Sequence, residues 1–200
     1  MKPVLLTLCL LLPAGPLLAA GPLAKIQSMV ARPKVLCGRF DQRKQLAGLK
    51  KPLVSNGRFC VVADKGVLWR TLQPFPNTLR LTRDEIVHFQ GDRVTMRLDA
   101  KQEPTVRMIN GLLFAVLTGD LDQLETRFEL EATIHDNSWS VGLKARDPAL
   151  AKVIGSIALQ GDAYVKNVAI SEASGDRTSI IFSAIETGDA AMTVDEAALF

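Results

Sequence analysis

Residues 53–72, with the sequence LVSNGRFCVVADKGVLWRTL, contain two short apolar runs joined by a turn sequence. The first run covers residues 53–62 and the second covers 67–72. Asp64-Lys65-Gly66 between them consists of residues that are common in tight turns. Runs of this length that are rich in β-branched and aromatic residues predict two antiparallel strands joined by a hairpin.

The same pattern continues on both sides of this hairpin. Six strands are expected between Cys37 and residue 98, at 39–46, 53–62, 67–72, 78–82, 85–89 and 93–98. Turn formers such as Pro74-Phe75-Pro76-Asn77 and Gly91-Asp92 separate them. So many consecutive short strands indicate one continuous, curled antiparallel sheet.

Helical periodicity replaces this alternation in two places. Apolar residues at helical spacing predict a first helix over 23–30, which Arg32-Pro33 ends. A second helix is expected from Pro104 to Gly119, with its apolar residues on one face. Asp120 then fits the N-cap of a further short helix that runs to residue 127.

Strands resume in the last third of the chain, at 128–134, 139–145, 153–160, 164–171 and 178–184, and a short helix is expected in the tail 189–200. The predicted fold is mostly β in the α+β class: an incomplete, curled antiparallel β-barrel of about eleven strands, with an N-terminal helix and a mid-chain helical lid. Residues 21–200 are expected to form a single domain. A sheet of this size curls or closes, so its inner face must be filled by side chains or by a ligand.

The first 20 residues are typical of an export signal. Lys2 is followed by an apolar run over 4–12 and by small residues up to Ala20, which predicts cleavage before Gly21. A membrane anchor is the alternative, but a spanning helix needs about 20 apolar residues and Pro13 interrupts the run. Cys9 lies inside the run, which argues against lipid modification. With a bacterial signal of this type, the expected location is the periplasm.

Charge excludes one class of partner. The 24 basic and 21 acidic side chains give a net charge of +3, and loss of Lys2 with the signal would leave +2. A charge this small does not provide the phosphate neutralisation that nucleic-acid binding requires. We therefore expect no nucleic-acid partner.

Loss of Cys9 with the signal would leave Cys37 and Cys60 as a pair. In a hairpin that turns near Gly48 or Leu49, Cys37 faces position 60 or 61. Two alternatives remain at this point: a disulfide, or two buried free thiols that pack as small apolar residues.

Few residues are available for acid-base or metal chemistry. The two histidines, His88 and His135, are separated by 47 positions and fit a strand and a turn. We predict no catalytic residue, no metal site and no cofactor. Arg80, Arg83, Arg93 and Arg97 form either a solvated strand face or a basic docking rim.

At several positions the chain resembles the bacterial periplasmic lipoprotein carriers of the LolA family. Phe40-Asp41-Gln42-Arg43-Lys44 is similar to the Phe-x-Gln-x-Lys strand of that family. Trp69, Gln73-Pro74 and Leu79-Arg80-Leu81-Thr82 follow at the family's spacing. The resemblance covers nearly all of residues 21–200.

The resemblance implies a monomer whose apolar cavity receives the acyl chains of lipoproteins. An inner-membrane donor protein would supply this cargo, and an outer-membrane acceptor protein would take it. By position, the implied cavity lining consists of Val30, Leu36, Val67, Trp69 and Leu79, with Ile109, Leu112, Leu113 and Val116 from the lid. Each of these residues also fits an ordinary apolar core.

One departure from the family affects the lid. Family carriers have an Arg-Pro pair six residues before the tryptophan, and its arginine helps to hold the lid against the barrel. Here the position is Ala63, followed by Asp64, and Lys65 lacks the planar guanidinium group. A carrier of another lipid or acylated product is therefore an alternative, and an enzyme that acts on a hydrophobic substrate is a third hypothesis.

Overall fold

The computed structural model describes residues 21–99, 101–102, 111, 114–118 and 120–200. The expected export signal lies outside these residues. The helices are α1 (Pro22–Met29), α3 (Leu121–Glu125), α4 (Pro148–Ala151), the 3₁₀ helix η1 (Asp189–Ala191) and α5 (Val194–Ala197), and residues 114–118 are also helical. The strands are β1 (Val35–Gln45), β2 (Leu53–Val62), β3 (Gly66–Gln73), β4 (Asn77–Leu81), β5 (Glu85–Gln90), β6 (Arg93–Asp99), β7 (Phe128–His135), β8 (Ser138–Ala145), β9 (Ile154–Gly161), β10 (Val165–Glu172) and β11 (Arg177–Thr187).

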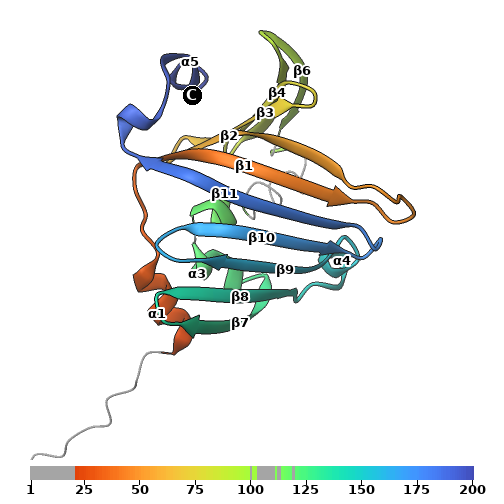
Figure 1. The fold of residues 1–200 in the computed structure, drawn as a ribbon, viewed down its shortest axis with the longest axis vertical. Helices are drawn as coiled ribbons and strands as arrows, with labels where there is room; N and C mark the ends of the chain where they lie inside the picture. Colours follow the sequence, from red (N-terminus) through yellow and green to blue (C-terminus); the bar gives the residue numbers. More distant parts are fainter. Residues whose placement is uncertain (1–20, 100, 103–110, 112–113, 119) are drawn as a thin grey trace, which may run out of the picture.

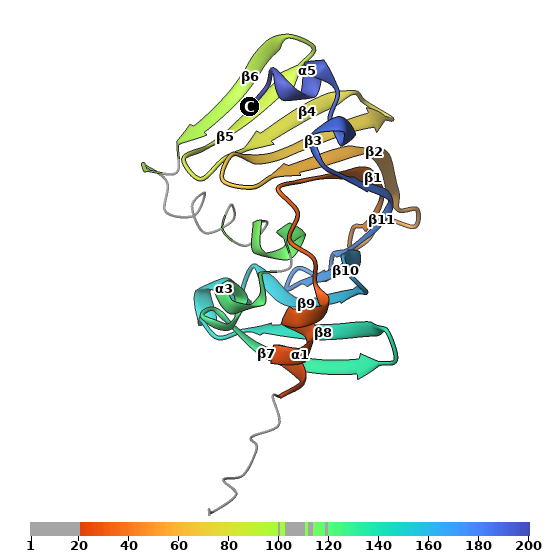
Figure 2. The same cartoon turned by 90° about the vertical axis from the view of Figure 1, so that its left-hand side faces the viewer.

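All eleven strands form one antiparallel sheet in the order β6-β5-β4-β3-β2-β1-β11-β10-β9-β8-β7. Each half is a meander of sequential neighbours, and the pairing of β1 with β11 joins the two halves. The sheet curls so that the helical residues 114–118 and α3 lie on its inner side, and β6 and β7 stand at its two ends (Figures 1 and 2). The predicted fold class, an incomplete curled barrel, is confirmed.

Most strand predictions agree with the structure within one or two residues. β2 covers the predicted 53–62, whereas β1 begins at Val35, four residues before the predicted start. This earlier start places Cys37 inside the strand, opposite Cys60. Helix α4 was not expected, because its four residues are too few for a periodic pattern. Asp120 occupies the N-cap position of α3 as predicted, but that helix ends at Glu125.

The inner face of the sheet holds a cluster of four aromatic rings. Phe40 stacks on Trp69 with 3.8 Å between ring centroids, and Phe59 and Phe182 are 4.8 Å apart. Two glycines make room for these rings. Gly57 pairs with Phe40, and Gly38 pairs with Phe59. A Cβ atom at Gly57 would lie 1.9 Å from the Arg70 carbonyl oxygen, and one at Gly38 would lie 2.8 Å from the Phe59 ring.

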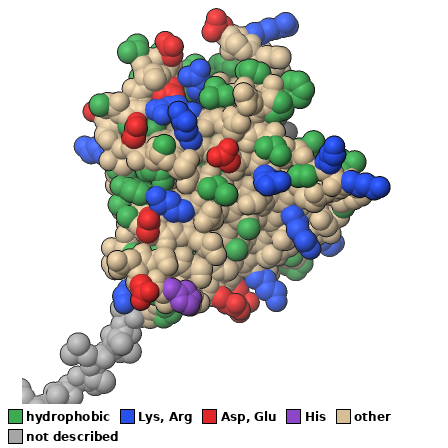
Figure 3. Space-filling model, in the orientation of Figure 1, with side chains coloured by type: hydrophobic (Ala, Val, Ile, Leu, Met, Phe, Trp, Pro, Cys, Tyr) green, Lys and Arg blue, Asp and Glu red, His purple; other side chains and the backbone are tan. Residues whose placement is uncertain are grey.

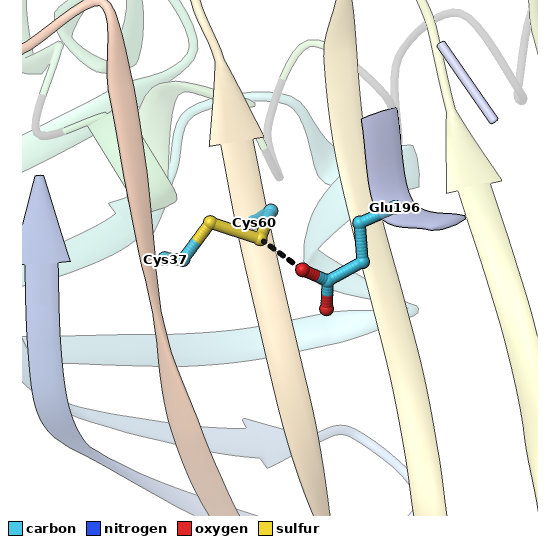
Figure 4. A group of neighbouring side chains, drawn as sticks. All are labelled: Cys37, Cys60 and Glu196. Carbon is cyan, nitrogen blue, oxygen red and sulfur yellow. Dashed lines mark hydrogen bonds between the residues drawn. A yellow bond between two sulfur atoms is a disulfide. The ribbon is translucent and has the colours of Figure 1, made fainter. Parts of the chain in front are cut away.

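The outer face carries a second, smaller apolar cluster beneath the C-terminal segment. Cys37 and Cys60 lie in this cluster, and the structure joins their sulfur atoms in a disulfide. Glu196 of α5 reaches the same place, with its Oε2 atom 3.7 Å from Cys60 Sγ (Figure 4). The tail therefore packs on the side of β1 and β2 opposite to the inner aromatic cluster.

Buried Glu196 fixes this tail to the sheet. Its Oε1 atom accepts a hydrogen bond of 2.8 Å from Arg58 Nε, and Arg70 Nη1 lies at 3.8 Å. Its Oε2 atom accepts a hydrogen bond from the backbone N–H of Thr193, whose hydroxyl accepts one from the backbone N–H of Glu196 in return. This reciprocal capping box satisfies free donors of the short helix α5. Arg80 adds a hydrogen bond of 2.8 Å to the Leu199 carbonyl oxygen.

Among the described residues, none belongs to a helix that is both long enough and apolar enough to cross a membrane.

Candidate functional site: an apolar cavity beneath the helices

A cavity of about 740 Å³ lies between the inner face of the sheet and the mid-chain helices. Its apolar wall comes from the α1–β1 connection, from β1, β2, β10 and β11, and from the helical residues 114–118. These wall residues are Val30, Pro33, Leu36, Phe59, Val61, Phe114, Ala115, Leu117, Val165, Phe182 and Ile185. A volume of this size falls in the range of about 300–1,000 Å³ that small-molecule sites occupy.

The aromatic cluster forms one side of this cavity. Phe59 and Phe182 contribute to the lining, while Phe40 and Trp69 pack beside them. Because Phe40 is buried and stacked on Trp69, the rings at the cavity surface have rigid support. The wall on this side is therefore both apolar and preformed.

Charged side chains border the cavity where the turns meet the helices. Arg32, Asp64, Arg83 and Asp120 all contribute to its lining. Arg83 Nη2 lies 3.4 Å from Asp64 Oδ1, and both side chains are largely exposed. The position at which family carriers have an arginine, Ala63, also lies at this border.

In the described part of the lid, α3 is attached to the first helix. The side-chain amide of Gln27 in α1 donates a hydrogen bond to Asp122 in α3. The backbone N–H of Asp120 donates to the carbonyl oxygen of Ala115 at 2.8 Å, which links the helical residues 114–118 to α3. Buried Leu121 and Leu124 anchor α3 in the main core.

Of the residues that the resemblance implied, Val30 and Leu36 lie along the cavity. Val67, Trp69 and Leu79 lie on the same inner face but belong to the core beyond the lining. Val67 is fully buried there, and Trp69 and Leu79 are partly buried. On the lid, Val116 is buried in the core, while its neighbours Phe114, Ala115 and Leu117 line the cavity. Ile109, Leu112 and Leu113 lie outside the described residues.

Sequence reasoning missed the part of the lining that comes from β2, β10 and β11. Alternation within residues 53–62 places Phe59 and Val61 on one face, so this signal was present in the sequence. Tyr164, Val165, Phe182 and Ile185, which lie in or next to β10 and β11, come from more than 100 positions further along the chain. Their approach depends on the pairing of β1 with β11, which local periodicity does not reveal.

Neither histidine lies at this cavity. His88 is on β5, and its Nδ1 atom shares a hydrogen bond of 2.5 Å with the Thr95 hydroxyl, whereas His135 is exposed at the end of β7. The described residues contain one cluster of potential metal ligands, formed by Cys37, Cys60 and Glu196. Zinc sites use cysteine thiolates, so the cluster lacks this donor set while the two sulfur atoms are bonded to each other.

The arginines of the β4–β6 region are mostly engaged within the protein. Arg80 Nη2 lies 2.5 Å from Glu85 Oε1, and Arg97 pairs with the other oxygen of Glu85. Arg80 and Arg97 therefore form ion pairs on the sheet, and Arg83 lies at the cavity border.

The fold and the cavity together define an open, curled β-barrel that encloses an apolar chamber beneath helices. Residues 19–200 match the family described as outer membrane lipoprotein carrier protein LolA-like. The chain belongs to this family. Among curated protein sequences, none matches the chain.

Several solved structures are similar to this one. A LolA superfamily protein from Nitrosomonas europaea has a TM-score of 0.45 at 10% identity, with 87% of this chain and 96% of that chain covered. A DUF1329 family protein from Desulfovibrio piger has a TM-score of 0.47 at 10% identity, with 86% and 92% covered. The MucA/MucB complex of Pseudomonas aeruginosa gives 0.41 at 14% identity, with 88% of this chain and 62% of that chain covered. The family assignment rests on the sequence match.

Proposed function

We propose that this protein binds the acyl chains of lipoproteins in its cavity and carries them through the periplasm. It would receive them from an inner-membrane donor protein and deliver them to an outer-membrane acceptor protein, as a monomer without a cofactor. The observation that carries this proposal is the apolar cavity of about 740 Å³ between the sheet and the helices, in a chain of the LolA-like family.

Binding by such a cavity needs no catalytic group, because burial of the acyl chain drives it. Each buried CH₂ contributes about 0.8 kcal/mol, so a chain of about sixteen carbons would contribute roughly 12 kcal/mol before ordering costs. Release therefore requires a competing interaction. Phe114, Ala115 and Leu117 of the lid face the cavity and would be covered by the sheet when the cavity is empty.

A second candidate is the transport of another lipid or acylated product in the same cavity. The observation that favours it is the border of the cavity, where Ala63 and Asp64 stand in place of the family's Arg-Pro pair. Asp64 faces Arg83 there, so this border differs chemically from that of the family carriers. Both candidates use the same apolar wall.

The first experiment is purification from the periplasm under native conditions, with mass spectrometry of whatever co-purifies. Recovered lipoproteins would support the first candidate, and free lipids or another acylated molecule would support the second. A protein that is recovered empty and that also fails to bind a fluorescent fatty-acyl probe would contradict both.

A substitution at the cavity border tests whether the acyl probe binds in this cavity. Ala63→Trp places an indole at this border, and displacement of about two CH₂ groups of the ligand would cost about 1.6 kcal/mol. The affinity for the fluorescent probe should therefore fall roughly 15-fold. Ala173→Trp, in the exposed β10–β11 turn away from the cavity lining, is the control and should bind the probe as the wild type does.

A further inference from the structure

The β1–β2 hairpin ends in an exposed apolar apex. Leu49, Leu53 and Val54 are 51%, 55% and 53% exposed, although residues of this kind are usually buried. In Figure 1 the apex extends past the neighbouring ends of β10 and β11. We call residues 43–54 the hairpin tip.

The hairpin tip is also the most basic part of the chain. It contains Arg43, Lys44, Lys50 and Lys51, and the sequence has no acidic residue between positions 42 and 63. Lys and Arg side chains gather at this end of the molecule in Figure 3. The hairpin tip therefore carries a charge of +4, whereas the whole chain has a net charge of only +3. Positive charge is thus concentrated at this end of the molecule.

Two carboxylates, at the end of β10 and in the adjacent β10–β11 turn, hold the hairpin in place. Glu172 Oε1 lies 2.9 Å from Lys44 Nζ, and Asp176 Oδ1 accepts a hydrogen bond of 2.8 Å from the Ala47 backbone N–H. Lys50 and Lys51, in contrast, form no ion pair with any carboxylate in the described part of the chain. Both lysines are exposed, so their charge is available to an external partner.

We propose that the hairpin tip docks onto an anionic lipid surface. Leu49, Leu53 and Val54 would enter the interfacial region of the bilayer, while Lys50 and Lys51 would lie among the anionic headgroups. Combined burial of apolar groups and attraction to anionic lipid is the basis of peripheral membrane binding. A positively charged tip matches this surface in sign.

The composition of the tip favours a membrane over an acidic protein partner. The cores of protein interfaces are enriched in aromatic residues and arginine and depleted in lysine. The hairpin tip has three lysines and no aromatic residue. Its protruding shape also fits insertion between headgroups better than burial against a second protein surface.

The tip is separate from the cavity. Leu36 and Val61 line the cavity at one end of the paired strands β1 and β2, and the tip is at the other end. The nine residue-to-residue steps from Leu36 to Gln45 correspond to about 30 Å of extended strand. Membrane docking would therefore leave the cavity mouth free, and the docking proposal does not depend on what the cavity binds.

Co-sedimentation of the full chain with vesicles tests the proposal. The wild type should bind phosphatidylcholine vesicles that contain phosphatidylglycerol, should bind pure phosphatidylcholine much less, and should be released by salt. Lys50→Gln/Lys51→Gln should weaken binding to the anionic vesicles roughly 25-fold, at about fivefold for each cation. Leu49→Ser/Leu53→Ser should also weaken it at least several-fold, with the charge unchanged.

Matched controls separate the tip from general charge effects. Lys25→Gln/Lys65→Gln removes the same charge from exposed positions in α1 and in the β2–β3 turn, and should bind the vesicles as the wild type does. The far-ultraviolet circular dichroism spectrum and the thermal midpoint should be unchanged in every variant, which shows that each one is folded whatever the cavity binds.

Three results would overturn the proposal. One is equal binding of the wild type to neutral and anionic vesicles. Another is equal binding by the tip variants and the control variant. The third is a tip that binds polyglutamate but not the vesicles, which would assign it to an acidic protein partner instead.

Discussion

Removal of the disulfide by Cys37→Ala/Cys60→Ala should destabilise the protein without affecting its cavity. The bonded residues are 23 positions apart, so in the chain-entropy description the cross-link contributes about 3.4 kcal/mol by restricting the unfolded chain. Both side chains are buried in the outer cluster beneath the C-terminal segment. The cavity is lined from the other face of the same strands, so the affinity for an acyl probe should not change.

Urea unfolding followed by tryptophan fluorescence measures this effect. With a slope of about 2–3 kcal/mol per molar urea, the midpoint should fall by roughly 1–2 M. The wild type treated with a phosphine reductant should fall by a similar amount, whereas the double variant should not respond to the reductant. This second comparison separates loss of the cross-link from loss of sulfur packing.

An unchanged wild-type midpoint after reduction would contradict a stabilising disulfide. Alkylation of both Cys37 and Cys60 in the unreduced protein, found by mass spectrometry, would also contradict it. Either result would favour the other sequence-based alternative, in which the two residues are free thiols packed in the outer cluster.

Three further substitutions test separate parts of the structure. Glu196→Gln should lower the free energy of unfolding by about 2 kcal/mol, because it leaves Arg58 without its charged partner; an unchanged urea midpoint would contradict this role. Gln27→Ala should speed hydrogen exchange in α3 with a change of less than about 0.5 kcal/mol in global stability, since it removes only the exposed hydrogen bond to Asp122; unaltered exchange would show that this bond does not hold the lid. Gly57→Ala should cost about 3 kcal/mol or more, because its Cβ would collide with a backbone carbonyl oxygen, and a thermal midpoint equal to that of the wild type would exclude this close approach.

The sheet was largely predictable from the sequence because each strand is marked by a pattern in its own residues and in the turns beside it. Alternation such as that in residues 53–62, together with turn formers such as Gly91-Asp92, marks each strand without reference to the rest of the fold. About eleven strands were expected, and the described residues form eleven. The beginning of β1 was missed because Val35, Leu36, Cys37 and Gly38 are buried on both faces and show no alternation.

The cavity was less predictable because its lining depends on the curl of the sheet. Periodicity gives the face on which a residue lies, and it places Val67 and Leu79 on the same inner face as Val61. It does not say how far along that face the cavity extends. The curl buries Val67 in the core, while the joining of β1 to β11 brings Phe182 to the cavity surface.

The attachment of the C-terminal tail to the sheet also could not be predicted from local sequence patterns. Glu196 in the first turn of α5 fits an ordinary helix-start acid, for which a cap explains the carboxylate. Its partner Arg58 lies 138 positions earlier, on the outer face of β2. The interaction arises only when the tail crosses that face, so the sequence pattern contained no indication of it.

β6 and β7 are the two edge strands of the sheet, so the curl around the cavity is not closed by a strand pairing. In a closed barrel every strand has two hydrogen-bonded neighbours, so the circumference is fixed and cannot widen without breaking a ladder. Here the described strands form a continuous sheet whose terminal members are bound on one side only. Bending of this sheet changes the distance between β6 and β7 while all of its ladders stay intact. The volume enclosed by the curl of the sheet can therefore change without the loss of any pairing between neighbouring strands.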